Sequence, residues 1–136
     1  MRKVLILLAA IGITGCTTTP VSTDKATDIP FDRVFNKSLL QTGPGRGAVI
    51  IKRDSGHVGN MCYSKLYLDG KEIAQIDVAE KLVFHPSIGD HLIGAYPGIC
   101  GGSLSEASIK VETGKTILYR IGYDSGVIYG LRPTAF

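Results

Sequence analysis

The chain has 136 residues and carries 15 Lys and Arg against 12 Asp and Glu, a formal net charge of +3. This length fits one domain with a single hydrophobic core, and not two. Its basic residues form no cluster that would follow a phosphate backbone, so we exclude nucleic acid as a partner.

The first residues have the order of a secretory signal. Arg2 and Lys3 are followed by an uncharged, almost wholly apolar run over residues 4–13, then by small residues at 14–15 and by Cys16. The apolar run is too short to cross a bilayer, which takes roughly 20 residues. We therefore predict a cleaved export signal.

The stretch Ile-Thr-Gly-Cys at 13–16 resembles the lipobox of bacterial lipoproteins. This resemblance implies a signal peptide over residues 1–15, with cleavage before Cys16 and acyl chains, palmitate among them, on that residue. An ordinary signal with a chance cysteine is the alternative. Thr17 follows, where lipoproteins retained in the inner membrane carry Asp, so the resemblance also implies the outer membrane, with the domain facing the periplasm.

Removal of the signal changes the apparent charge of the chain. Without Arg2 and Lys3, 13 basic side chains remain against 12 acidic ones, a net charge of +1. The mature domain is nearly neutral, so the acyl chains provide the membrane interaction that we expect.

Residues 16–46 are predicted to hold the lipidated N-terminus, a linker and a short segment that packs on the domain. Residues 17–24 are polar and predict a flexible tether reaching on the order of 20 Å. Apolar residues within 31–39 recur at i, i+3, i+4 and i+8. That spacing fits a short amphipathic helix, and equally an irregular segment that lays Phe31 and Phe35 on the domain.

Residues 47–136 alternate apolar and polar side chains, the pattern of half-buried strands in an antiparallel sheet. Seven or eight short strands at this spacing predict an all-β domain, a β-sandwich or a small barrel. We find no helical period in this range. The predicted strand segments are 49–51, 65–69, 71–73, 82–84, 91–93, 107–112, 117–123 and 127–129.

Glycine-containing turns separate several of these strands. Asp69-Gly70 and Thr113-Gly114 each lie between two alternating segments, so both predict β-hairpins. Ser125-Gly126 marks a further turn.

Three stretches resemble the DUF2846/PEGA-like group of bacterial envelope domains. They are residues 66–74, with Asp-Gly-Lys after a strand, 87–93, with Gly-Asp-His entering a strand, and 109–119, with Gly-Lys-Thr before a strand. The resemblance implies an immunoglobulin-like antiparallel β-sandwich in a lipoprotein and implies no activity. The chain departs from the group at 88–90, where Ile precedes Gly-Asp, and at the Cys-Gly-Gly of 100–102.

Cys62 and Cys100 are the two cysteines not assigned to lipid. In an oxidising compartment an even pair predicts a disulfide. It closes a loop of nearly forty residues, which is worth roughly 4 kcal/mol at most. Metal ligation with His57, His85 or His91 is the alternative, but neither Cys-x-x-Cys nor His-x-x-x-His spacing is present. We expect no metal and no cofactor.

No catalytic motif is complete in the sequence. The glycine-rich residues 43–47 lack the Gly-Lys-Ser/Thr of a phosphate loop, and 101–105 departs from Gly-x-Ser-x-Gly. We therefore predict no catalytic residues, and a protein that is not an enzyme. His57, Tyr67 and Tyr96 form the candidate binding face, because tyrosine combines an apolar ring with a polar hydroxyl.

The predicted function is a non-enzymatic binding or structural module of the envelope, with another envelope protein or the cell wall as partner. One alternative is a small-ligand binder or enzyme that uses the loops 54–62 and 96–105. A deep polar pocket between those loops would favour it. An inhibitor or immunity-type protein is the other alternative.

Overall fold

The computed structural model describes residues 17–136, so the predicted signal and Cys16 lie outside the described residues. Within this range the chain forms nine strands and three short 3-10 turns, with no α-helix. In chain order the elements are β1 (Thr27–Asp28), η1 (Phe31–Arg33), η2 (Lys37–Leu40), β2 (Ala48–Arg53), β3 (Ser64–Leu68), β4 (Lys71–Ile76), β5 (Glu80–Phe84), β6 (Gly89–Tyr96), η3 (Gly98–Cys100), β7 (Ser105–Val111), β8 (Thr116–Asp124) and β9 (Ile128–Pro133).

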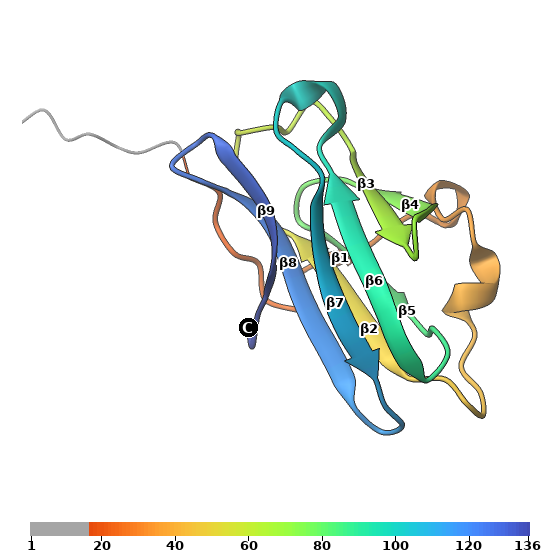
Figure 1. Cartoon of the computed structure of the whole chain (residues 1–136). Helices are drawn as coiled ribbons and strands as arrows, with labels where there is room; N and C mark the ends of the chain where they lie inside the picture. The colour runs from red at the N-terminus through yellow and green to blue at the C-terminus, as the bar shows by residue number, and fades with distance from the viewer. Residues whose placement is uncertain (1–16) are drawn as a thin grey trace, which may run out of the picture.

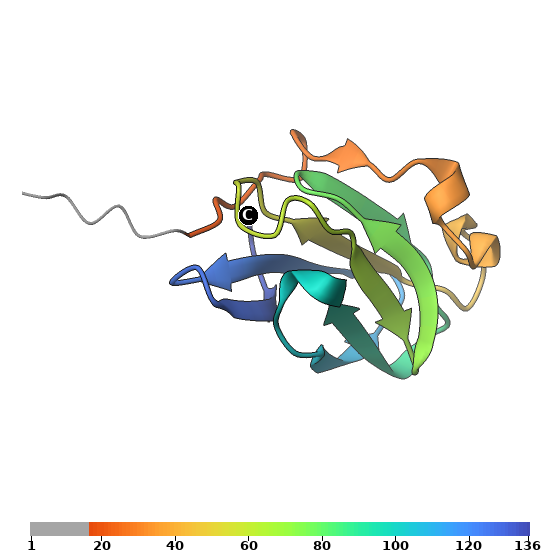
Figure 2. The ribbon, with the colours of Figure 1, turned by 90° about the horizontal axis from the view of Figure 1, so that it is seen from above.

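The strands form two sheets that face each other, in the order β1-β5-β2-β8-β9 and β4-β3-β6-β7 (Figures 1 and 2). The predicted β-sandwich is confirmed, and a strand occurs at each of the eight predicted segments. Most neighbouring strands are antiparallel, but β2 pairs in parallel with β8 and β1 in parallel with β5. The pairing of β2 with β8 brings together an early and a late strand of the chain.

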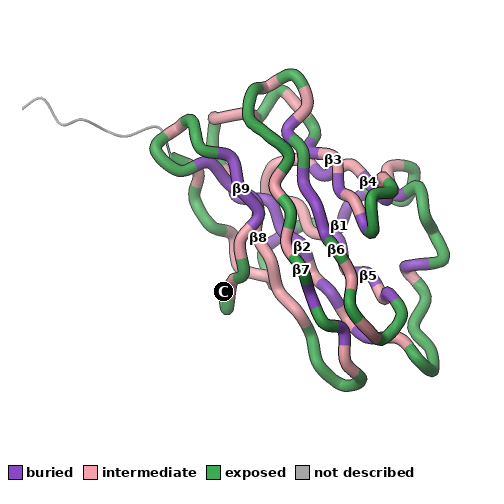
Figure 3. Tube along the Cα trace, in the orientation of Figure 1, coloured by how far each residue is buried: buried purple, intermediate pink, exposed green. Residues whose placement is uncertain are grey.

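Buried residues lie along the strands of both sheets (Figure 3), and they alternate most clearly with less buried ones in β3. In β3, Leu66 and Leu68 are buried, whereas Lys65 and Tyr67 are half-buried on the outer face. This is the period-two pattern seen in the sequence, and burial of the apolar face is what favours the fold. The buried apolar residues of the long strands include Val49, Ile51, Leu66, Leu68, Ile73, Ile76, Leu82, Phe84, Ile93, Ile109, Val111, Ile121 and Leu131.

Two of the predicted turns have different roles. Asp69 and Gly70, with φ of 49° and 78°, join β3 to its antiparallel neighbour β4, as predicted. The hairpin expected at Thr113-Gly114 is wrong, since β7 pairs with β6 while β8 pairs with β2 and β9. That turn crosses from one sheet to the other. Turn residues fix the local reversal of the chain and do not specify which strand becomes the neighbour.

Residues 17–29, expected to begin with a flexible tether, lie along the sandwich instead. Thr19 and Ser55 exchange two backbone hydrogen bonds of 2.9 Å. Further on, β1 extends the sheet beside β5. Backbone N–H and C=O groups pair at a sheet edge whatever the polarity of the side chains. The folded unit therefore begins well before residue 47.

The segment 31–40 is irregular and contains two 3-10 turns in place of the candidate helix. Val34 is extended, with φ of −98° and ψ of 113°, and bridges to Ala74 of β4. This bridge requires extended backbone at Val34, whereas a helix over these residues would require helical dihedral angles there. Val34 and Leu39 are buried, whereas Phe31 and Phe35, expected to pack on the domain, are exposed.

A buried carboxylate at the end of β2 fixes the start of the described chain. Oδ2 of Asp54 accepts hydrogen bonds from Thr18 Oγ1 at 2.9 Å and from Arg120 Nη1 at 2.5 Å. Thr18 Oγ1 in turn accepts the backbone N–H of Tyr123 at 2.9 Å. Burial raises the pKa of Asp54 above its ordinary value, against the opposing effect of Thr18 and Arg120. The chain is thus pinned at Thr18.

Gly122 of β8 makes this arrangement testable, because it leaves room for the Asp54 carboxylate. A Cβ at Gly122 would overlap Oδ2 of Asp54 and lie 2.7 Å from Thr18 Oγ1. We predict that Gly122→Ala lowers the free energy of unfolding by about 1–3 kcal/mol, the usual cost of overpacking. Urea denaturation measures this change.

The matched control is Gly43→Ala, because nothing lies within 4 Å of a Cβ there. Away from buried features a substitution changes stability by about 0.5 kcal/mol or less. Equal stability of the two variants would contradict the close approach of Gly122 to Asp54.

Candidate functional site

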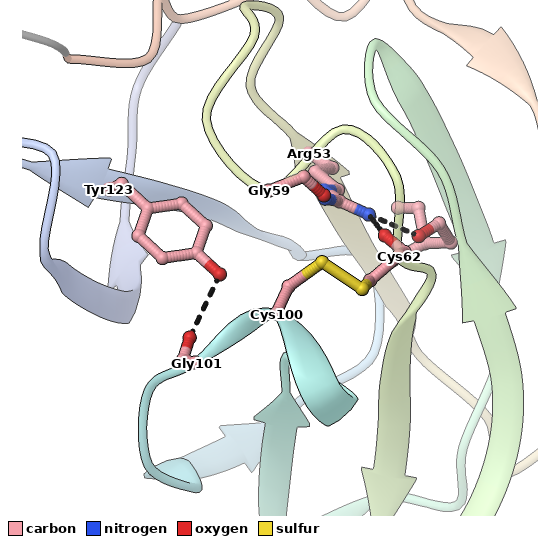
Figure 4. Close-up of a disulfide and its surroundings, with 7 residues drawn as sticks. Arg53, Gly59, Cys62, Cys100, Gly101 and Tyr123 are labelled. Atoms are coloured by element: carbon pink, nitrogen blue, oxygen red, sulfur yellow. Dashed lines mark hydrogen bonds between the residues drawn. A yellow bond between two sulfur atoms is a disulfide. The ribbon is translucent and has the colours of Figure 1, made fainter.

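The predicted disulfide is present and joins the β2–β3 loop to the β6–β7 loop (Figure 4). The Cα atoms of Cys62 and Cys100 are 5.9 Å apart, within the range that a disulfide spans. The bond links the two loops that the sequence analysis singled out at 54–62 and 96–105. These loops are therefore parts of one structure at one end of the sandwich.

A buried arginine organises the backbone beneath the disulfide. Nη1 of Arg53 donates to the carbonyl oxygens of Cys62 at 2.6 Å and Ile76 at 3.0 Å, and Nη2 donates to the carbonyl oxygen of Gly59 at 2.6 Å. Burial lowers the pKa of Arg53, yet a guanidinium stays charged in proteins. Its donors are directed at backbone carbonyls, so the charge holds the loop in one conformation.

Tyr123 connects the same two loops to the β8–β9 hairpin (Figure 4). Its hydroxyl donates to the carbonyl of Gly101 at 3.1 Å. Gly59, with φ of 70°, passes so close to the ring that a Cβ there would lie 2.8 Å from it. We call residues 55–63, 97–104 and 125–128 the loop end, because disulfide, arginine and tyrosine make them one packed unit.

An open groove of about 380 Å³ lies at the side of the loop end. The Arg33 guanidinium covers the ring of Tyr63, 4.6 Å from its centroid. This groove is open, whereas small-ligand sites enclose most of the ligand surface. Its lining residues are Met61, Cys62, Tyr63, Lys65, Gln75, Tyr96, Gly98 and Ile99.

The three residues of the candidate binding face are only partly brought together. Tyr96 lines the groove. Tyr67 lies on the same outer sheet face, since Lys65 pairs with Tyr96 and Tyr67 with Gly94. His57 is exposed on the β2–β3 loop and does not line the groove. The strand residues share a face because of register, whereas no pattern could place the loop residue.

The sequence analysis missed a cluster of Asp69, His91 and Ser87 at the opposite end of the sandwich. Nδ1 of His91 is 2.7 Å from Oδ2 of Asp69, and Nε2 is 3.2 Å from Oγ of Ser87. The Asp-Gly-Lys and Gly-Asp-His motifs contain two of these residues, but they predicted only a turn after one strand and the entry into another. The pairing follows from β3 and β6 being neighbours in the sheet.

Although these residue types and the contact of Asp69 with Nδ1 of His91 match a Ser-His-Asp triad, the contact of His91 with Ser87 does not. Nε2 of His91 is 2.8 Å from the Ser87 carbonyl oxygen, closer than it is to the hydroxyl. A carbonyl only accepts, so this contact is a hydrogen bond when Nε2 is protonated, as it is in the imidazolium form that Asp69 favours; in that form Nε2 is not a base toward Ser87. Asp69 also accepts the backbone N–H of Leu92 at 2.9 Å. The cluster fastens the β3–β4 turn to β6.

The pKa values of this pair agree with an ionic contact. Burial lowers the pKa of His91, but hydrogen bonds to Asp69 and to the Ser87 carbonyl outweigh it, and the net shift is upward. Burial raises the pKa of Asp69, but the hydrogen bonds from the N–H of Leu92 and from the His91 ring outweigh burial, and the net shift of this pKa is downward. Each group therefore favours the charged form of the other.

The residues considered as metal ligands do not meet. The two cysteines are bonded to each other, and Nδ1 of His85 lies 2.9 Å from the Gly47 carbonyl oxygen. Among residues 17–136, no three His, Cys, Asp or Glu side chains are grouped so that they could hold a metal ion.

The part of the chain that the structure describes contains no helix long and apolar enough to cross a membrane. Comparison with family models, curated proteins and solved structures finds no match to this chain.

His91 gives a pH prediction whose sign follows from its raised pKa. The protonated ring favours the folded state, so its contribution is complete below the ordinary pKa of 6.5 and is lost as the pH rises through the raised value. The contribution of His91 makes the free energy of unfolding of the parent protein fall between pH 5.5 and 8.5. We predict that His91→Gln makes this fall smaller by about 0.5–1 kcal/mol. Urea denaturation at both pH values measures it.

His57→Gln serves as the control, because His57 is an exposed loop residue. It should leave the pH dependence of the parent protein unchanged. An unaltered pH dependence in His91→Gln would show that the Asp69–His91 contact contributes nothing.

Proposed function

We propose that the chain is a lipoprotein of the bacterial cell envelope, anchored by acyl chains on Cys16, whose β-sandwich is a non-enzymatic binding or structural module. The proposal places it at the outer membrane, facing the periplasm, after removal of residues 1–15. It also includes membership of the DUF2846/PEGA-like group, on the basis of the motifs at residues 66–74, 87–93 and 109–119.

The disulfide is the observation that carries this proposal. Disulfides persist in exported proteins and are rare where thiols are kept reduced. Three cysteines are present in the chain, and the bond between Cys62 and Cys100 takes two of them. Cys16, the third, is the cysteine of the lipobox-like stretch, so all three have a role that fits export.

The surface chemistry supports binding in preference to catalysis. In the triad-like cluster, Nε2 of His91 is closer to the Ser87 carbonyl oxygen, at 2.8 Å, than to the Ser87 hydroxyl, at 3.2 Å. The groove beside the disulfide is open and presents tyrosine, methionine and isoleucine side chains. Tyrosine and methionine are enriched where proteins contact one another, whereas enzymes and small-ligand sites enclose their ligands. An envelope protein or the cell wall is the partner class that we propose.

Acylation is tested by replacing the cysteine that would carry it. We predict that Cys16→Ala abolishes incorporation of labelled palmitate into the full chain in growing bacteria, because the thiol is the acceptor. The label and the intact mass of the purified protein measure this directly.

Cys100→Ser is the matched control, since it removes a cysteine that is bonded within the domain. It should keep the palmitate label. Label that persists in Cys16→Ala, or that is absent from the parent protein, would refute the anchor.

A further inference from the structure

Thr18 is held at a fixed place on the sandwich. The Thr18 hydroxyl is held between Asp54 and the N–H of Tyr123, and the Thr18 N–H donates to the Tyr123 carbonyl at 3.3 Å. Cys16 precedes Thr18 by two residues in the sequence. An extended chain spans at most about 3.6 Å per residue, so lipid on Cys16 would attach within roughly 7 Å of Thr18.

Thr18 lies beside the loop end. A Cβ at Gly56 would be 3.5 Å from the Cα of Thr18, and Thr19 pairs with Ser55. The β2–β3 loop, the β6–β7 loop and the β8–β9 hairpin all lie toward this end of the sandwich (Figure 1). A membrane that holds the acyl chains must therefore come close to these loops.

The chemistry of the loop end suits a lipid surface. Its three segments, 55–63, 97–104 and 125–128, contain no Asp, Glu, Lys or Arg. Four of its apolar side chains are more than half exposed, with exposed fractions of 93% for Met61, 99% for Ile99, 74% for Val127 and 59% for Ile128. Moving an uncharged loop with apolar tips from water to the lipid interface costs little desolvation free energy, and contact of its apolar side chains with acyl chains is favourable.

Tyrosines and a rigid base add to this arrangement. Tyr63 and Tyr96 are partly exposed and line the groove next to Met61 and Ile99. Tyrosine favours the boundary between lipid and water, where its ring and its hydroxyl are both accommodated. Because the disulfide joins the two loops, their tips do not have to be ordered on contact.

The opposite end of the sandwich has the contrary character. Its turns at 43–47, 69–71, 85–90 and 112–116 each contain at least one charged residue. Those residues are Arg46, Asp69, Lys71, Asp90, Glu112 and Lys115. We call these turns the far end. Asp54 and Asp124 directly precede two of the loop-end segments, but no Asp, Glu, Lys or Arg lies within them. Charged groups are costly to bring into a bilayer, so this difference between the segments and the far end orients the domain in the same sense as the attachment point.

We propose that the loop end is a membrane-contact surface, in which Met61, Ile99, Val127 and Ile128 enter the lipid interface while the far end points away from it. This inference rests on the proposed acylation of Cys16. The acyl chains supply the attachment, and the apolar tips fix which way the domain faces. The groove beside Tyr63 and Tyr96 then lies at the level of the headgroups.

A single tryptophan reports the depth of a chosen residue, because the chain contains none. Ile99→Trp is made in the full chain, which is purified with its acyl chains and reconstituted into phosphatidylethanolamine and phosphatidylglycerol vesicles with or without brominated acyl chains. We expect the brominated lipid to quench the tryptophan of this variant about twofold or more, since interfacial elements lie about 5–10 Å into the boundary.

Ile88→Trp is the matched control at the far end, where Ile88 is 45% exposed and its N–H donates to the Gly45 carbonyl. Its fluorescence should not change with bromination. Val127→Trp, on the hairpin tip, should be quenched as strongly as Ile99→Trp. Circular dichroism and the absence of free thiol confirm that each variant is folded and oxidised.

Flotation of the vesicles separates the two proposals. Protein that floats with the lipid but shows equal, weak quenching in Ile99→Trp and Ile88→Trp would overturn the contact surface and leave the anchor standing, with the tips then free for a protein partner. Protein that carries no acyl chain and does not float would overturn the anchor, and the contact surface with it.

Discussion

The buried carboxylate of Asp54 determines how the chain enters this domain. It lies at the end of β2, accepts hydrogen bonds from Thr18 and Arg120, and fits only because Gly122 has no side chain. A charge removed from water needs such partners. Since Thr18 follows so closely on the residue proposed to carry lipid, the hydrogen bond from Thr18 to Asp54 also fixes where a membrane would meet the sandwich.

The loop end is stable without being covered by other parts of the domain, which is what a contact surface requires. Arg53 donates to three backbone carbonyls below it, and the disulfide between Cys62 and Cys100 ties two loops together. Arg53 and the disulfide hold these loops from the inner side of the domain. The side chains on the outer side are therefore not needed to hold the loops, and they can be apolar. Exposed apolar tips on a rigid base favour contact with a second surface, whereas a flexible loop would first have to be ordered.

How much the sequence predicts depends on how local each signal is. The eight segments with alternating polarity form strands, because a strand with one buried face shows that period along its own length. The disulfide follows from counting cysteines. The pairing of Thr19 with Ser55, the crossing of the Thr113-Gly114 turn between sheets and the contact of Asp69 with His91 were not predicted. Each depends on which strands become neighbours, and no short motif encodes that choice.

The orientation of the domain at the membrane is therefore the claim on which this account depends. Hydrogen exchange of the acylated chain on vesicles, compared with the Cys16→Ala chain in solution, tests it most directly. The account predicts slower exchange of backbone amides within 55–63, 97–104 and 125–128, with no change at 43–47 and 112–116. Slower exchange at the far end, with none at the loop end, would contradict it.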